Sequence, residues 1–285
     1  MPAASWLSIA DITIAVRCSD DRLQWTWEEP VSRFLVSERD AEVELNIAVG
    51  DATRRNEATP LFDSGSVWKL FHDAGGHRIE CTSEAYGAGP YKTALFDESF
   101  TRGTIVMRPD VAHLNPLDYP LDEVLIANLL GRGRGVELHS CGVIDREGRG
   151  HLFAGVSGAG KTTTARLWQD AARGIVSDDR VIVRERGAAP WMFGTPWHGE
   201  AELSLAGGAP LAGVYLLVQA AQNELRPLPQ AEAVARLFRC AFPLFHDAAS
   251  LDFTLSFLER LAASVPVREL RFTRDPAVVD LVLAA

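Results

Sequence analysis

The first 115 residues alternate between apolar and polar positions in short runs. Residues 41–49 (AEVELNIAV) alternate almost strictly, and residues 11–16 are rich in β-branched side chains. A period of two is typical of strands that bury one face and expose the other. Similar runs separated by Gly, Asp and Pro follow at 67–71, 77–81, 91–96 and 104–107. This segment therefore predicts an antiparallel sheet, and it contains no spacing that is typical of a catalytic site.

After Pro116 the pattern becomes that of alternating strands and helices. A helical spacing of apolar residues at 121–130 is followed by a predicted strand–strand–helix–strand order, at 136–144, 151–154, 161–172 and 174–177. This order is typical of an α/β nucleotide-binding core. A strand (211–221), two helices (230–242 and 247–262), a last strand (265–272) and a closing helix (276–283) complete it. We therefore expect a smaller β-rich N-terminal domain at 1–115 and an α/β domain at 116–285.

Composition and charge exclude several classes of protein. The 285 residues are 47% hydrophobic and 23% charged, as in ordinary globular proteins, and the net charge of −10 argues against a non-specific nucleic-acid binder. The longest apolar stretch, 211–218, is much shorter than the roughly 20 residues of a bilayer span. The start resembles no secretory signal, and the four cysteines form no CxxC pair. We expect a cytoplasmic protein without a nucleic-acid or membrane partner; whether it forms a homo-oligomer stays open.

A glycine-rich sequence carries the strongest chemical signal. Residues 155–162 (GVSGAGKT) match the pattern G-x-x-x-x-G-K-[ST] between a predicted strand and a predicted helix. Glycines let successive N–H groups converge on phosphate oxygens at the positive end of the helix. Lys161 would reach the β- and γ-phosphates, and the Thr162 hydroxyl would bind Mg²⁺. The pattern predicts ATP and Mg²⁺ as cofactors, with Gly155, Ser157, Gly158, Ala159, Gly160, Lys161, Thr162 and Thr163 as the nucleotide-binding residues.

Asp178 and Asp179 follow the short apolar strand at 174–177. Two adjacent carboxylates at the end of a strand are costly unless a cation or a proton compensates them. A Mg²⁺ ion held by Thr162 and bound phosphate would do so, and phosphoryl transfer also needs a carboxylate to accept the proton of the attacking hydroxyl. A turn or a helix cap is the alternative role, since Asp is common in both.

Two histidines and a group of arginines are weaker candidates. His139 lies on the predicted strand that precedes the glycine-rich loop, so it could point toward the phosphates, and His198 lies in an irregular aromatic loop suited to holding a substrate or a base. A lone histidine is nevertheless more often structural than catalytic. Five C-terminal arginines could stabilise transition-state charge, although solvated surface is the commoner role; they are Arg236, Arg239, Arg268, Arg271 and Arg274.

Together, His139, GVSGAGKT and the sequence VSDD at 176–179 resemble the kinase domain of HPr kinase/phosphorylase and its relatives, which shares its core with phosphoenolpyruvate carboxykinase. The resemblance covers about residues 135–275 and does not include residues 1–115. It implies a P-loop kinase core in which Lys161 binds phosphate, Thr162 and Asp179 bind Mg²⁺, Asp178 is the general base and His139 lies at the phosphate side.

The chain also departs from this pattern. We find no Gly/Arg-rich downstream element of the kind that the bifunctional HPr enzymes use. Instead, a loop at 190–199 (PWMF…TPWHG) looks like the HPr-kinase-related proteins of bacterial biosynthetic clusters. Some of these phosphorylate a serine of a precursor peptide, as in lasso-peptide pathways. The chain is short for a true carboxykinase.

The expected function is therefore that of an ATP- and Mg²⁺-dependent serine kinase acting on a peptide or small protein, with residues 1–115 as a candidate recognition module. Two alternatives stay open. A kinase for a sugar or metabolite hydroxyl should show an enclosed pocket beside the glycine-rich loop. A regulatory module would bind ATP without transferring phosphate.

Overall fold

A computed structural model describes residues 4–18, 20–52, 59–65, 67–73 and 75–285. The chain is mixed α/β and divides into two compact units, Met1–Leu129 and Leu130–Ala285, which we describe separately. Helix α1 (Leu121–Leu129) belongs to the first unit, which thus extends beyond residue 115. No helix within the described ranges has the length and apolar character needed to cross a membrane.

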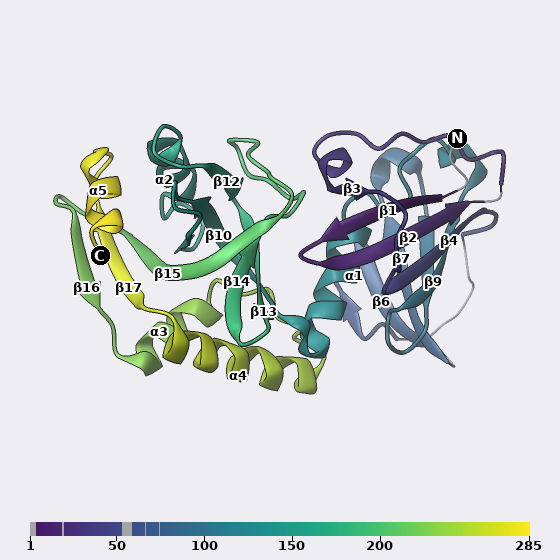
Figure 1. The fold of residues 1–285 in the computed structure, drawn as a ribbon. Coiled ribbons are helices and arrows are strands. Elements are labelled where there is room, and N and C mark those ends of the chain that lie inside the picture. The colour runs from purple at the N-terminus through teal and green to yellow at the C-terminus, as the bar shows by residue number, and fades with distance from the viewer. Residues whose placement is uncertain (1–3, 19, 53–58, 66, 74) are drawn as a thin grey trace. The chain divides into compact units, whose positions relative to one another are not determined.

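The first unit is built on a nine-stranded sheet in the order β3-β1-β2-β4-β9-β8-β7-β6-β5 (Figure 1). Helix α1 buries Leu121, Leu125 and Leu129 completely, which is the spacing of one helix face. The strands are β1 (Ala4–Ile9), β2 (Ile12–Cys18), β3 (Leu35–Val36), β4 (Val43–Val49), β5 (Phe62–Asp63), β6 (Trp68–Asp73), β7 (Gly76–Thr82), β8 (Pro90–Phe96) and β9 (Arg102–Met107).

The prediction of an antiparallel sheet with one solvent-exposed face is wrong in two respects. Strand β4 pairs in parallel with both β2 and β9, so the sheet is mixed. Alternation along β4 identifies its buried face but not its direction, which depends on the long connection that carries the chain back from β2. In addition, four consecutive residues of β8, from Tyr91 to Ala94, are buried, so both faces of the sheet are covered there.

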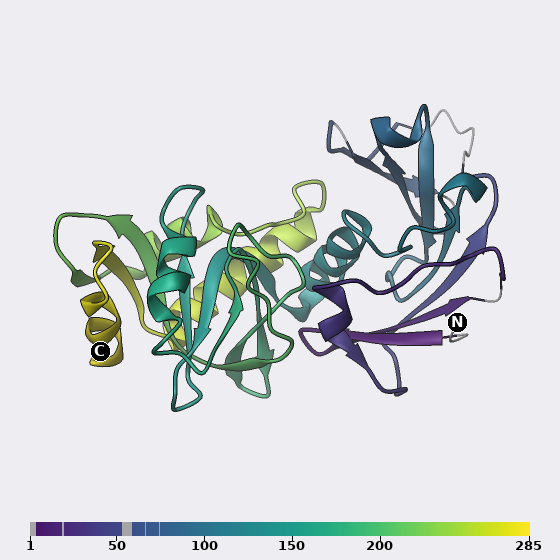
Figure 2. The same ribbon diagram turned by 90° about the horizontal axis from the view of Figure 1, so that it is seen from above.

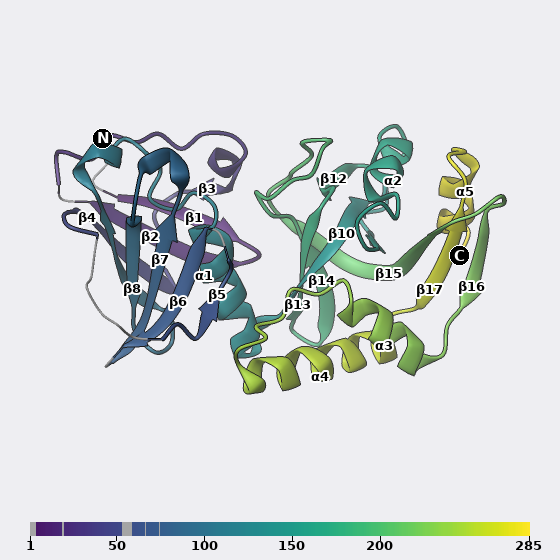
Figure 3. The same ribbon diagram turned by 180° about the vertical axis from the view of Figure 1, so that it is seen from behind.

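The second unit has an eight-stranded sheet (Figure 3). Its order is β11-β10-β13-β14-β15-β17-β16, with β12 beside β10 and an additional parallel pairing of β11 with β15. Five strands, β11, β10, β13, β14 and β15, therefore form a closed circuit. The strands are β10 (Val136–Ile144), β11 (Gly150–Ala154), β12 (Gly174–Ser177), β13 (Arg180–Arg186), β14 (Ala189–Phe193), β15 (Gly208–Gln219), β16 (Glu224–Pro227) and β17 (Val267–Phe272).

One segment of this sheet corrects the sequence analysis. Residues 190–199 were expected to form a single irregular loop, but the first part of this segment belongs to β14, which pairs with both β13 and β15. Met192 and Phe193 are buried in the sheet. Pro190 weakens the strand pattern of this segment. The segment is nevertheless a strand because it pairs on one edge with its sequence neighbour β13 and on the other with the more distant β15.

Helices cover both faces of the second sheet: α2 (Lys161–Trp168), α3 (Gln230–Phe238), α4 (Ala248–Ser264) and α5 (Ala277–Leu283) (Figures 1 and 2). Successive residues of β11 point to opposite faces, as a pleated strand requires. Leu152 packs in a core with side chains of α3 and α4, whereas Phe153 packs in a second core with side chains of α2 and α5. The carboxyl end of β11, where the glycine-rich loop begins, is thus held from both sides.

A buried histidine makes the stability of this core depend on pH. His151 of β11 is 4% exposed, its Nε2 lies 3.0 Å from Asp145 Oδ2, and its ring stacks on Trp168. Burial lowers the pKa of His151, although the hydrogen bond with Asp145 opposes this shift. In the unfolded chain this histidine becomes protonated near pH 6.5, whereas in the folded protein its protonation requires a lower pH. The stability from this group is therefore complete above about pH 6.5 and is lost as the pH falls below that value.

We predict that His151→Gln flattens the pH dependence of stability. Between pH 7.5 and 5.5, the free energy of unfolding of the wild type should fall more steeply than that of the variant, by at most about 1.4 kcal/mol per pH unit. Urea unfolding followed by tryptophan fluorescence at several pH values measures the two slopes. Parallel slopes would contradict the prediction, whatever the difference in absolute stability.

Candidate functional site

The glycine-rich loop, residues 155–160, joins β11 to α2. Gly158 and Gly160 have φ values of 78° and 108°, in the left-handed region that favours glycine. Gly160 is the N-cap of α2, and a Cβ placed on it would lie 2.5 Å from the Phe272 ring. Both conformation and space therefore require glycine at Gly160. The loop leads directly into the first turn of α2, whose N–H groups have no partner within the helix and favour an anion.

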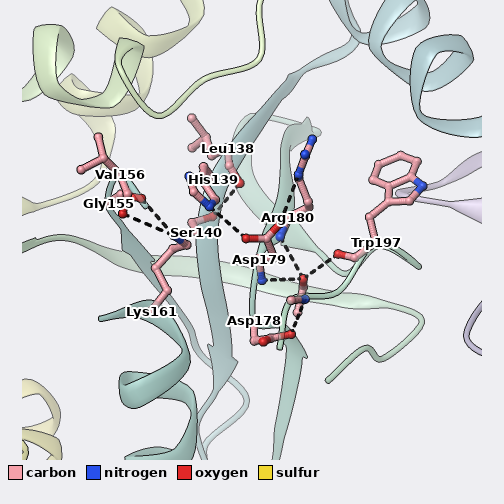
Figure 4. A network of polar contacts seen from close by, with 12 residues as sticks. Leu138, His139, Ser140, Gly155, Val156, Lys161, Asp178, Asp179, Arg180 and Trp197 are labelled. Carbon is pink, nitrogen blue, oxygen red and sulfur yellow. Dashed lines mark hydrogen bonds and ion pairs between the residues drawn. The ribbon is translucent and has the colours of Figure 1, made fainter. Parts of the chain in front are cut away.

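Lys161 lies folded back over this loop. Its side chain is largely buried, and Nζ donates to the carbonyl oxygens of Gly155 at 3.2 Å and Val156 at 3.5 Å (Figure 4). Burial lowers the pKa of Lys161, while the negative charge of Asp179 opposes this shift most. Within the described residues Lys161 forms no ion pair, so its bonded partners are neutral carbonyls. An anionic ligand can replace them with a gain in electrostatic energy.

Asp178 is almost completely buried, with 1% of its surface exposed. Its Oδ1 accepts hydrogen bonds from the N–H groups of Gly199 at 2.9 Å and Leu203 at 3.4 Å, and its Oδ2 accepts one from Ala201 at 2.9 Å. Both carboxylate oxygens are thus occupied by the backbone of one loop, residues 199–203. The contacts of Asp178 are those of a structural anchor.

Asp179 has different surroundings. Its side chain is 28% exposed, with Oδ1 2.9 Å from His139 Nε2 and Oδ2 3.3 Å from Arg180 Nε. The hydrogen bond with His139 lowers the pKa of Asp179 and outweighs burial, which acts in the opposite direction. Figure 4 shows the Asp179 carboxylate turned toward His139 and that of Asp178 turned away. The structure therefore brings together Lys161, His139 and Asp179, with Asp178 behind them.

Further residues support this group and were not among the sequence candidates. Arg180 Nη1 lies 3.0 Å from Glu137 Oε1, and its guanidinium lies 3.9 Å from the centroid of the Phe242 ring. Glu137 precedes His139 by two positions on β10, so a strand places both side chains on one face. That periodicity is the signal that could have identified Glu137. Phe242 follows α3 and has no such signal.

The remaining candidates are more scattered. Thr162 and Thr163 occupy the first turn of α2, next to the glycine-rich loop. His198 is exposed, and its Nδ1 lies 3.0 Å from the carbonyl oxygen of its neighbour Gly199. In the part of the chain that the structure describes, no contact joins His198 to His139 or Lys161. Its role in holding a substrate stays a prediction.

The donor set fits Mg²⁺ bound together with phosphate better than a metal held by protein alone. Among the described residues no group of three or more His, Cys, Asp or Glu side chains could hold a metal ion. Mg²⁺ commonly binds through one or two protein oxygens, with phosphate oxygens and water completing its shell. The Thr162 hydroxyl and the Asp179 carboxylate are oxygens of the required kind.

Cavities flank the glycine-rich loop. One of about 190 Å³ lies between the first turn of α2 and the ends of β15 and β17; it is lined by Gly160, Thr163, Gln219, Ala220, Phe272, Thr273 and Arg274. Its position beside the loop suits a group attached to bound phosphates, such as a nucleoside. A second cavity, of about 100 Å³, lies where β11 enters the loop.

No protein-family model matches this chain, and no curated protein matches it.

The contacts of the paired aspartates predict unequal effects on stability. Asp178→Asn replaces one acceptor oxygen with an amide that faces a backbone N–H, so it should lower the free energy of unfolding by about 2–4 kcal/mol. Asp179→Asn, at a partly exposed site, should cost less than about 1.5 kcal/mol. Urea unfolding measures both values, and amide hydrogen exchange at residues 199–203 should accelerate in the Asp178 variant alone. Equal costs and equal exchange would show that Asp178 does not anchor this loop.

Proposed function

We propose that this protein is an ATP- and Mg²⁺-dependent kinase with a P-loop kinase core, which transfers phosphate to a serine hydroxyl of a peptide or small protein. One observation carries the proposal: Lys161, buried and bonded only to carbonyls of the glycine-rich loop, lies close to an ionised Asp179 that is held by His139. Phosphoryl transfer requires two groups of the protein: a cation that binds the phosphates, and a carboxylate that accepts the proton of the attacking hydroxyl.

The residues of the loop would bind and orient the triphosphate. Lys161 would exchange its contacts with Gly155 and Val156 for phosphate oxygens, and the first N–H groups of α2 would donate to the same ligand. Thr162 would hold Mg²⁺, which when bound neutralises charge on the phosphates. The cavity at Gly160 and Phe272 would receive the nucleoside.

The hydrogen bonds lead us to assign to Asp179 the role of the general base, which accepts the proton of the attacking serine hydroxyl. The resemblance to HPr kinases gives the role of general base to Asp178, but a base must come within about 2.6–3.2 Å of the hydroxyl it deprotonates. Both oxygens of Asp178 accept backbone N–H groups, and its side chain is buried. The oxygens of Asp179 are bonded to two side chains, His139 and Arg180, and its side chain is 28% exposed, so a substrate hydroxyl can approach it. Its depressed pKa keeps it ionised at neutral pH. In this proposal His139 positions Asp179, and Asp178 positions the loop at 199–203.

A peptide acceptor is favoured over an enclosed metabolite. With the cavity of about 190 Å³ assigned to the nucleoside, the other cavity beside the loop, of about 100 Å³, is smaller than the roughly 300–1,000 Å³ of pockets that enclose a small-molecule ligand. Apolar side chains are also exposed at the site: Val156 in the loop, and Phe242, whose ring centroid lies 6.1 Å from that of His139. Exposed apolar groups next to a site are typical of surfaces that bind another chain.

The proposal predicts separable effects on transfer and on binding. With radiolabelled ATP and an arrayed library of serine peptides, Lys161→Ala should lower the transfer rate at least about 100-fold, because it removes a charge that stabilises the transition state. Asp179→Asn should lower transfer by a similar factor while calorimetry shows ATP binding within about threefold of the wild type. Arg166→Ala, at an exposed position of α2, is the matched control and should keep the wild-type transfer rate and the wild-type affinity for ATP.

Transfer that survives Lys161→Ala would refute the kinase proposal. ATP binding without transfer to any peptide or metabolite would instead identify a regulatory module. If a folded Asp178→Asn protein loses transfer and Asp179→Asn does not, the base is Asp178 and the assignment of this role to Asp179 is wrong.

A further inference from the structure

The second cavity beside the glycine-rich loop, which we call the α3 cavity, is not used by the proposed nucleotide site. It has a volume of about 100 Å³ and lies where β11 enters the loop, beside the C-terminal end of α3. Its lining is Ala154, Gly155, Val156, Leu216, Leu217, Arg236, Arg239 and Cys240. This volume accommodates a few water molecules or one small polar group, but not a nucleoside.

Two arginines of different status face the α3 cavity. Arg236 Nη1 lies 2.6 Å from Glu269 Oε2 and 3.5 Å from Glu232 Oε1, so its charge is already compensated. Arg239 is solvent-exposed and forms no ion pair with any described residue. No carboxylate lines the cavity, and the other lining side chains are apolar or a thiol. The cavity therefore has one uncompensated positive charge, which favours an anionic guest.

The α3 cavity is connected to the proposed catalytic group through three of its lining residues. The two carbonyls that hold Lys161 Nζ belong to Gly155 and Val156, which both line the cavity. Cys240 also lines it, and its carbonyl oxygen accepts the N–H of His139 at 2.7 Å. A ligand group in this cavity would therefore lie beside both Lys161 and the strand that carries His139.

The surroundings favour an anion that belongs to a peptide over a free ion. Val156, which lines the cavity, is 47% exposed, and Phe242, two residues after Cys240, is 36% exposed. A free anion gains nothing from exposed apolar side chains, whereas a peptide can cover them. The planar guanidinium of Arg239 also suits the two oxygens of a carboxylate.

We propose that the α3 cavity binds an acidic side chain of the acceptor peptide, an Asp or Glu near the phosphorylated serine, through Arg239. This inference rests on the proposed kinase function and names the class of its substrate. The cavity holds the carboxylate while the neighbouring serine reaches Asp179. Arg239 is thus a specificity-determining residue, and Arg236, held by Glu269, shapes the wall.

Peptide binding without turnover tests this inference. Fluorescein-labelled peptides with one central serine carry Asp, Asn or Lys at each other position in turn, and their binding is measured by anisotropy with a non-hydrolysable ATP analogue and Mg²⁺ present. We expect the wild type to bind at least one Asp peptide about tenfold more tightly than its Asn counterpart. Arg239→Ala should remove this ratio, and Arg239→Glu should favour the Lys peptide. The matched control Arg166→Ala should keep the ratio.

Other outcomes overturn the inference. Equal binding of Asp and Asn peptides, or an acid preference that survives Arg239→Ala, removes the carboxylate site. Inorganic phosphate that binds through Arg239 while no peptide shows an acid preference would make the guest a free anion. A tenfold loss of affinity for the ATP analogue in Arg239→Ala would assign the cavity to the nucleotide.

The same variants separate this inference from the kinase proposal. If the acid preference depends on Arg239 but no peptide receives phosphate from ATP, the cavity binds acidic peptides and the kinase proposal fails. If neutral peptides are phosphorylated as well as acidic ones by both the wild type and Arg239→Ala, the kinase proposal stands and the cavity proposal fails.

Discussion

The arrangement of the site depends most on the hydrogen bonds between the buried Asp178 carboxylate and the backbone of residues 199–203. A charged group out of contact with water is costly unless hydrogen bonds compensate it. Here the N–H groups of Gly199, Ala201 and Leu203 do so, which holds the loop at 199–203 against the end of β12. Because Asp178 is turned into the protein, its neighbour Asp179 faces His139 instead. The contacts of Asp178 thus fix both the loop at 199–203 and the orientation of Asp179 toward His139.

The glycine-rich loop and the two cores that hold it form the second element of this arrangement. Leu152 and Phe153 pack on opposite faces of the sheet, so the start of the loop has little freedom to move. Two loop carbonyls accept hydrogen bonds from the Lys161 ammonium group. Burial of this charge costs free energy, as the lowered pKa of Lys161 reflects. In the proposed mechanism this cost is recovered when phosphate replaces the carbonyls, which is the logic of a preorganised electrostatic site.

Local patterns were the more reliable guide to the fold. The strand, glycine-rich loop and helix at 150–168 depend on residues adjacent in sequence, and the structure contains all three in the predicted order, although the helix ends at Trp168 and not at residue 172. The parallel pairing of β4 with β9 and the pairing of β14 with β15 depend on partners far along the chain. Hydrophobic alternation reports which face is buried, but it contains no information on strand direction or on the neighbouring strand.

For the site, the sequence by itself determined which residues surround the loop: Lys161, the paired aspartates and His139. It could do so because a phosphate-binding turn needs glycines, a cation and a helix start in immediate succession. Only the tertiary structure decided which aspartate is accessible, that Glu137, Arg180 and Phe242 support it, and that Arg239 faces a cavity beside the loop. Adjacent carboxylates are equivalent in a sequence, and backbone donors from a distant loop make them different.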